Sequence, residues 1–328
     1  MRGVPKRKNG LLRRLSAAML AFLVLGLSGC ARLVPDEAAE TLSVYASFYP
    51  IYALTALITA DVPGVETHCL VQPQEGCLRN YELSDWDLYT LGYAADAVVI
   101  GGRGLESFEA QLYAMGDEGP AIIRAFNGMD LYNDDGSDAD AEDASHWDGE
   151  NPHAYMSIEC ARTAVEAIAE NLALLDPEHA ELYAANLASA QQRFEALEAD
   201  ISKIKTDAGL KVILLNEALV YSALDLSLEI DGWYARESGT ALSENEFADF
   251  LDTVADCEAS VVLLEKQAPQ SLVKQLETAG YRVARLDILS EGREDLGTER
   301  YFSAQLENAE AVQAAFSAQS KEFGGGNP

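Results

Sequence analysis

A short set of polar residues, at the ends of predicted strands and in one loop, could do chemistry in this sequence. In open parallel sheets, ligands bind beyond the carboxyl ends of the strands, so polar side chains there can reach a ligand. These positions are 79–82, Asn216 and Glu217, Glu265 and Lys266, Asp287, and the segment 151–154 that contains His153. Taken singly, each is unremarkable, because most polar loop residues only meet solvent. Their chemistry depends on which of them the fold brings together.

The apolar runs before these residues predict two parallel sheets. Short apolar runs alternate with helical spacing in two separate stretches, and strands that are apolar throughout are typical of parallel sheets covered on both faces. The predicted strands are 43–48, 65–71, 97–100 and 121–124 in the first stretch, and 212–215, 260–264 and 281–286 in the second. We therefore predict an α/β fold with two lobes, each a mostly parallel sheet flanked by helices.

Helical spacing is found between the strands and between the two lobes. The stretches with this spacing are 51–60, 84–94, 157–175 and 177–205. Ser84 is a candidate cap, Ser243 and Glu246 have the spacing of a capping box, and Asp176-Pro177 is a suitable start for the last stretch. We predict that this last stretch is a long backbone helix that joins the lobes.

The expected organisation has a targeting segment, two lobes and linking helices. The expected parts are a signal peptide at 1–29 with a lipobox ending at Cys30, a tether at 30–41, an N-terminal α/β lobe at 42–156 with an acidic loop at 130–150, linking helices at 157–205, a C-terminal α/β lobe at 206–322, and a flexible tail at 323–328.

The composition argues against several classes of function. Among 328 residues, 54 Asp and Glu face 23 Lys and Arg, which gives a formal net charge of -31. Such a surface repels phosphate backbones, so we expect no nucleic-acid binding. The sequence has no nucleophile–base constellation, phosphate-binding glycine loop or His-Glu-x-x-His spacing. We therefore expect a binding protein rather than an enzyme.

The first thirty residues have the pattern of an export signal. Residues 1–29 hold six basic residues and no acidic one, and the apolar run 15–27 is too short to span a membrane comfortably. The ending Leu27-Ser28-Gly29-Cys30 resembles the bacterial lipobox, which implies that Cys30 is lipidated and anchors the protein on the extracytoplasmic face of the cell membrane. An ordinary signal peptide with a chance cysteine is the alternative.

Four cysteines remain after Cys30, in a compartment where disulfides can persist. They are Cys69, Cys77, Cys160 and Cys257, and four cysteines allow three pairings. We favour a Cys69–Cys77 disulfide because these two residues enclose a short loop. No Cys-x-x-Cys spacing is present, so a thiolate zinc site is not expected.

Several motifs in order carry a family resemblance. The segments 46–50 (Ala-Ser-Phe-Tyr-Pro), 102–106 and 151–155 are followed by the strand end at Glu265 and by Asp287. With these motifs the chain resembles the solute-binding lipoproteins of zinc- or manganese-importing ABC transporters, from about Leu42 to Phe316. The resemblance implies one metal ion bound between two lobes, with a ligand from each, and delivery of that ion to an ABC permease in the membrane. We expect the receptor to be a monomer.

The ligand positions that the resemblance implies are filled incompletely. His153 matches the histidine before the linking helices, Asp287 matches the acidic ligand, and the remaining second-lobe position falls on Asn216, or on Glu217 if the alignment slips by one residue. His153, Glu217 and Asp287 would form a nitrogen–oxygen–oxygen set that suits Zn²⁺ or Mn²⁺. Glu265 is a possible accessory ligand.

Arg79 stands where the resemblance implies another histidine. A guanidinium has no lone pair to donate, so Arg79 is not a metal ligand. In one interpretation Arg79 pairs with Asp287 or Glu82 and closes the site, and the chain is then an adhesin or a receptor for another solute. In the other, Arg79 points away and His146 of the acidic loop replaces the missing ligand. We predict a lipid-anchored receptor for a divalent metal ion, zinc in preference to manganese.

Overall fold

The computed structural model describes residues 41–71, 78, 81–133, 150–204 and 209–323. The signal segment 1–29, Cys30, Cys77, Arg79 and His146 lie outside these ranges, so the predictions that concern them stay predictions. None of the helices in the described ranges has both the length and the hydrophobicity that crossing a bilayer requires.

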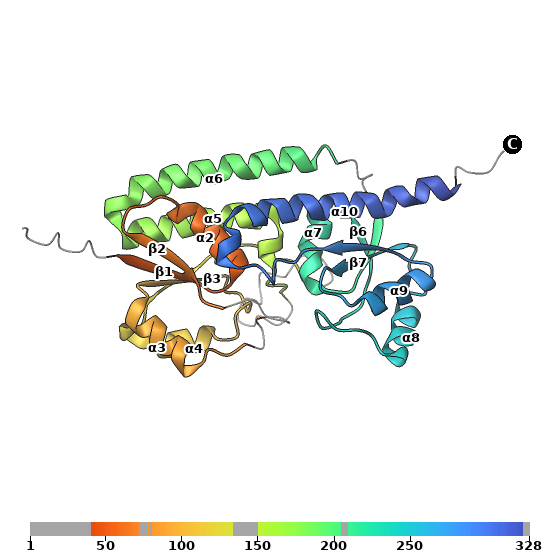
Figure 1. The fold of residues 1–328 in the computed structure, drawn as a ribbon, viewed down its shortest axis with the longest axis horizontal. Helices are drawn as coiled ribbons and strands as arrows, with labels where there is room; N and C mark the ends of the chain where they lie inside the picture. The colour runs from red at the N-terminus through yellow and green to blue at the C-terminus, as the bar shows by residue number, and fades with distance from the viewer. Residues whose placement is uncertain (1–40, 72–77, 79–80, 134–149, 205–208, 324–328) are drawn as a thin grey trace, which may run out of the picture. The chain divides into compact units, whose positions relative to one another are not determined.

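The first lobe is built on a four-stranded parallel sheet (Figure 1). Its strands are β1 (Leu42–Ala46), β2 (Val65–Cys69), β3 (Ala97–Ile100) and β4 (Ala121–Arg124), in the spatial order β2-β1-β3-β4. Its helices are α2 (Tyr49–Thr59) on one face, and α3 (Asp85–Ala94), α4 (Glu109–Ala114) and the 3-10 turn η2 (Gly116–Glu118). Ser84 caps α3 in a capping box with Asp87, as the sequence predicts for this position.

The second lobe repeats this architecture. Its strands are β5 (Lys211–Leu214), β6 (Glu229–Trp233), β7 (Val261–Glu265) and β8 (Arg282–Leu286), all parallel, in the order β6-β5-β7-β8. Its helices and turns are η6 (Glu217–Leu219), α7 (Val220–Asp225), α8 (Glu244–Thr253), α9 (Gln270–Thr278) and η7 (Glu294–Leu296). Ser243 and Glu246 form the predicted capping box at the start of α8. The predicted α/β class with two parallel sheets is confirmed.

Two long helices link the lobes along the chain, and a third, which follows the last strand of the second lobe, packs beside them. The linking pair is α5 (Ile158–Leu175) and α6 (Ala180–Ile201), and α10 (Glu299–Phe323) runs beside α6 and packs on β8 (Figure 1). The 3-10 turn η5 (Pro177–His179) comes before α6, so α6 begins three residues later than predicted. The carboxylate of Asp176 does not cap a helix, because it accepts hydrogen bonds from the His179 ring and from the Tyr183 hydroxyl.

One hydrophobic core runs through both lobes. It includes Val44 and Val99 of the first sheet, Phe194 of α6, and Val212 and Leu263 on one face of the second sheet, all of them fully buried. A second cluster packs the opposite face of β5 and β7 against α8 and α9. Because separating the lobes would expose apolar surface of the shared core, burial holds the two sheets in one arrangement.

Candidate metal site

Side chains of the second lobe hold the segment that carries His153. The segment leads from Glu150, which bridges to Asn133, through the 3-10 turn η4 (Ala154–Met156) to α5. Three second-lobe side chains donate to its carbonyl oxygens: Tyr221 to Asn151 at 2.7 Å, Tyr301 to Tyr155 at 2.7 Å and Gln305 to Met156 at 3.0 Å. His153 precedes the linking helices in sequence, yet its backbone is fixed to the second lobe.

Asp225 fastens the start of α5 to the same lobe. Its carboxylate accepts a hydrogen bond of 2.7 Å from the Ile158 amide and one of 3.2 Å from the Ser157 hydroxyl. Burial raises the pKa of Asp225 to about 6, although both hydrogen bonds favour the ionised form. The first residues of the helix that follows His153 are therefore hydrogen-bonded to a carboxylate at the end of α7.

Asn151 fixes which nitrogen of His153 carries the proton. The Nδ2 group of Asn151 donates to the Glu217 carbonyl oxygen at 2.8 Å, and its Oδ1 accepts from the His153 amide at 3.0 Å. The same Oδ1 lies 2.9 Å from His153 Nδ1, so Nδ1 must be the donor in that contact. In the neutral ring the lone pair is then on Nε2, the atom that would coordinate a metal ion.

Glu217 is the carboxylate that faces this nitrogen. Its Oε1 lies 3.9 Å from His153 Nε2, while the His153 side chain is 6% exposed and that of Glu217 is 26% exposed. Asn216 is turned to other partners, since its Oδ1 caps η6 through the Ala218 amide and its Nδ2 lies 3.4 Å from Glu265. The structure therefore brings Glu217, and not Asn216, to the imidazole.

Glu265, the possible accessory ligand, is buried and paired with an arginine. Its carboxylate is fully buried and accepts two hydrogen bonds from Arg236 Nη2 and a third, of 2.8 Å, from the Gly239 amide. The Arg236 side chain is only 2% exposed. Glu265 would have to leave its guanidinium partner before it could bind a cation, and its accessory role stays a prediction.

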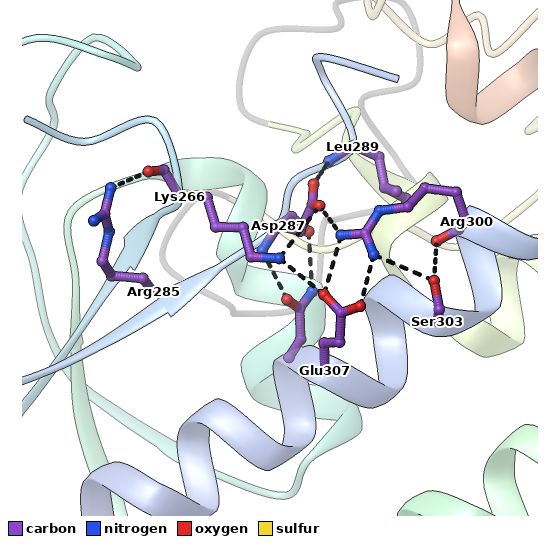
Figure 2. Close-up of polar contacts among 8 residues, drawn as sticks. Lys266, Arg285, Asp287, Leu289, Arg300, Ser303 and Glu307 are labelled. Atoms are coloured by element: carbon purple, nitrogen blue, oxygen red, sulfur yellow. Dashed lines mark hydrogen bonds and ion pairs between the residues drawn. The ribbon is translucent and has the colours of Figure 1, made fainter. Parts of the chain in front are cut away.

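The Asp287 carboxylate is paired with two cationic side chains of the protein, Arg300 and Lys266 (Figure 2). Its Oδ2 pairs with Arg300 Nη2 and lies 3.6 Å from Lys266 Nζ, and its Oδ1 accepts from the Leu289 amide at 2.8 Å. Arg300 was not among the partners predicted for Asp287, and the predicted pairing with Arg79 stays a prediction because Arg79 lies outside the described residues. The predicted triad of His153, Glu217 and Asp287 is not assembled, and the part of the chain that the structure describes contains no group of three or more His, Cys, Asp or Glu side chains that could hold a metal ion.

In the first lobe, the motifs 46–50 and 102–106 lie in loops that hydrogen bonds to Glu106 hold together. Glu106 is 2% exposed and accepts hydrogen bonds from the Ser47 hydroxyl at 2.7 Å and from the amides of Gly101 and Gly102 at 2.8 and 2.9 Å. Burial raises the pKa of Glu106 to about 7. This carboxyl group therefore joins the loops that follow β1 and β3, next to an ion pair between Arg103 and Glu150.

The loop between β8 and α10 reaches the first lobe. Tyr49 donates to the Gly297 carbonyl oxygen at 2.9 Å, and Gly292 lies so close to the Tyr49 ring that a Cβ atom there would fall 1.9 Å from it. Glu294 accepts a hydrogen bond from the Cys69 amide. Cys69 is a free, buried thiol that donates to the Val71 carbonyl oxygen, so the predicted disulfide is not formed at Cys69; Cys77 lies outside the described residues.

Comparisons with known proteins agree on one family. Residues 44–315 match the family profile described as zinc-uptake complex component A, periplasmic. The chain belongs to this family. The assignment places it among solute-binding components of uptake systems and not among enzymes.

Individual relatives have low sequence identity to this chain but match most of its length. The zinc-binding lipoprotein AdcA of Streptococcus pneumoniae serotype 4 is 23% identical over 312 residues, which are 92% of this chain and 61% of AdcA. The chain thus spans about three fifths of that relative. The solute-binding protein FpvC of Pseudomonas aeruginosa, solved with Ni²⁺, has 23% identity and a TM-score of 0.71 over 85% of this chain and 98% of FpvC. The laminin-binding adhesin Lmb of Streptococcus agalactiae has 20% identity and a TM-score of 0.67 over 84% of this chain and 99% of Lmb.

Three residues have roles at this site that were not predicted from the sequence. Asn151 orients the His153 imidazole, Arg236 neutralises Glu265, and Arg300 forms an ion pair with Asp287. Asn151 stands two residues before His153, and this short separation was a usable signal for a residue that supports a ligand. The two arginines could not be paired with their carboxylates from the sequence.

Proposed function

We propose that the chain is a lipid-anchored extracytoplasmic receptor that captures a divalent metal ion and delivers it to an ABC permease. The family assignment supports uptake of a metal, and the AdcA relative is a zinc-binding lipoprotein. Lipidation of Cys30, the permease partner and the monomeric state are parts of this proposal that rest on the sequence pattern.

The observation that carries the proposal is the pairing of His153 with Glu217. Asn151 leaves the lone pair of His153 on Nε2, and a carboxylate oxygen lies 3.9 Å from that atom. Zinc bonds to imidazole nitrogen and to carboxylate oxygen are each about 2.0–2.2 Å long, so one ion can touch both atoms at this separation. This pair is thus of the right size to hold the cargo ion between its two donor atoms.

We propose zinc as the cargo in preference to manganese. Imidazole suits zinc, and at a given nitrogen and oxygen site zinc binds more tightly than manganese. Water molecules or Asp287 would complete the coordination. The acidic surface of the chain, with 54 acidic residues, would concentrate cations near the site.

Isothermal titration with zinc and with manganese, on full-length chain stripped of metal by a chelator, tests the proposal. We expect one saturable zinc site and weaker manganese binding. His153→Ala should lower the zinc affinity by about 100-fold or more, since it removes a ligand. His179→Ala is the matched control, because His179 also pairs with a carboxylate, Asp176 at 2.7 Å, but on the linking helices. Absence of a saturable site, or equal effects of the two variants, would reject the proposal.

A second candidate function is supported by the state of Asp287. If Arg300 and Lys266 keep this carboxylate permanently, the chain retains the fold with a reduced metal site and serves as an adhesin or as a receptor for another solute. The structural similarity to the adhesin Lmb makes this a concrete alternative. Zinc present at a 1:1 ratio in protein purified without added metal would exclude it.

A further inference from the structure

Three aromatic side chains of α3 are exposed to solvent and form a row along the helix. Trp86, Tyr89 and Tyr93 are 72%, 60% and 82% exposed. The ring centroids of Trp86 and Tyr89 lie 5.7 Å apart, those of Tyr89 and Tyr93 lie 6.0 Å apart, and the two tyrosine rings are parallel to within 4°. Steps of three and four residues place all three rings on one side of the helix, and this surface is named the α3 row below.

The α3 row does not contribute to the packing of the first lobe. Helix α3 contacts the core through the fully buried Leu91 and the partly buried Leu88, which lie on the opposite side of the helix from the row. The helix lies on the side of the first sheet away from α5 and α6 (Figure 1). A cluster of exposed aromatic side chains that the fold does not need is typical of a surface that binds a partner.

The chain around the α3 row is acidic. Residues 81–102 contain no Lys, Arg or His, and their acidic residues are Glu82, Asp85, Asp87 and Asp96. Asp85 precedes Tyr89 by four residues, so it lies at the edge of the row. Within the described ranges, neither Asp85 nor Glu82 forms an ion pair, and both are exposed. Such a surface attracts a cationic partner, whereas a second copy of this chain, with a formal net charge of -31, would be repelled.

The first lobe itself shows which cation suits an exposed tyrosine beside a carboxylate. The guanidinium of Arg124 lies 4.8 Å from the centroid of the Tyr113 ring and pairs with Glu109 at 2.5 Å. The ring face attracts the cation, and the carboxylate neutralises it. The α3 row presents rings and a carboxylate, Asp85, in the same way, but none of the described arginines lies over it. The row therefore has two of the three groups of this arrangement and lacks the guanidinium.

We infer that the α3 row is a docking surface for a basic segment of another protein, whose arginine side chains stack on the rings and pair with Asp85 and Glu82. Arginine is favoured over lysine, because a planar guanidinium can stack on a ring while it pairs with a carboxylate. The surface contains no residue of the candidate metal site, so the inference does not depend on the proposed function.

Titration of the full-length chain with an acetylated and amidated tetra-arginine peptide, followed by NMR, tests the inference. The indole N–H resonance of Trp86, identified by its loss in Trp86→Phe, reports binding at the row. We expect a saturable shift of this resonance and weaker binding of a tetra-lysine peptide of the same length. A resonance that does not move, or equal affinity for the two peptides, would overturn the inference.

Variants of the row separate stacking from general attraction by charge. Tyr89→Ala combined with Tyr93→Ala should weaken peptide binding about tenfold, because each exposed contact of a cation with a ring contributes about two- to fivefold. Tyr113→Ala is the matched control, since this exposed tyrosine of the same lobe already lies under Arg124, and affinity should stay within twofold of the wild type. Thermal unfolding followed by circular dichroism verifies that the variants are folded.

Other occupants of the row would give different results. Equal weakening by the double variant and by the control would show that net charge alone attracts the peptide. A shift of the Trp86 resonance with phosphatidylcholine vesicles and none with the peptide would assign the row to a membrane. A dimer in sedimentation velocity that the double variant abolishes, without peptide binding, would assign it to a second copy. Each of these results overturns the inference, and none of them bears on zinc binding.

Discussion

Replacing Asn151 by alanine should damage the metal site without removing a ligand. Asn151 is fully buried and makes three contacts, to the His153 amide, to His153 Nδ1 and to the Glu217 carbonyl oxygen. Removing a group that orients a metal-binding histidine usually lowers metal affinity 10- to 100-fold, which corresponds to about 1.4–2.7 kcal/mol. We expect zinc affinity to fall by this factor, because the ring loses its fixed orientation and proton position.

The same substitution also lowers stability, so a matched control is needed. It leaves the His153 amide and the Glu217 carbonyl group without their partner, and each buried unsatisfied group costs about 1–3 kcal/mol. Asn186→Ala provides the control, since Asn186 Nδ2 donates to the carbonyl oxygens of Ile58 and Ala60 at 2.8 Å each, on the first lobe. Urea unfolding should show that both variants are destabilised.

Competition with a chromogenic chelator then compares zinc affinity in the two variants at a temperature where both are folded. Only Asn151→Ala should lose affinity. Equal zinc affinity in Asn151→Ala and in the wild type would refute the view that Asn151 fixes the lone pair of His153 on Nε2. Equal losses in both variants would show that stability, and not ring orientation, controls binding.

Four further predictions concern zinc binding, stability and membrane attachment. Zinc affinity, measured by calorimetry, should fall about tenfold or more from pH 7 to pH 5, because a protonated His153 has no lone pair; a constant affinity would contradict its role. Burial raises the pKa of Glu106 from 4.5 to about 7, so between these pH values the folded chain holds a proton that the unfolded chain loses, and the free energy of unfolding in urea should decrease with rising pH by up to about 3 kcal/mol; Glu106→Gln should flatten this dependence. Arg236→Ala leaves the fully buried Glu265 carboxylate without its charge partner and should lower the free energy of unfolding in urea by about 3–5 kcal/mol. A decrease below about 1 kcal/mol would disprove a tight buried pair. Cys30→Ala should release the protein from the membrane fraction in an immunoblot, and retention there would exclude the lipid anchor.

The sequence was sufficient for those parts of the fold that depend on local patterns. The capping residues Ser84 and Ser243 act on amides within one turn, and buried parallel strands such as 261–265 are continuous apolar runs. The edge strand β6 was missed because Glu229-Ile-Asp-Gly-Trp mixes charged and apolar residues and contains a glycine. Helix α10 was not predicted either, although Tyr301 and Val312 on it are fully buried.

The candidate site was only partly predictable, since its electrostatics depend on distant partners. His153 and Glu217 were both candidates, and the fold brings them together across 64 positions of sequence. Whether a carboxylate is available to a metal depends on which cation lies beside it. Arg300 and Arg236 reach Asp287 and Glu265 only after α10 and the segment following β6 have packed on the second sheet. No local spacing encodes these pairs.

A crystal structure of the zinc-loaded chain, with anomalous diffraction recorded at the zinc absorption edge, tests the central claim most directly. We predict one strong anomalous peak about 2.0–2.1 Å from His153 Nε2, with a carboxylate oxygen of Glu217 at about 2.0–2.2 Å. A zinc peak at any other position, with His153 and Glu217 both outside its coordination shell, would contradict the account.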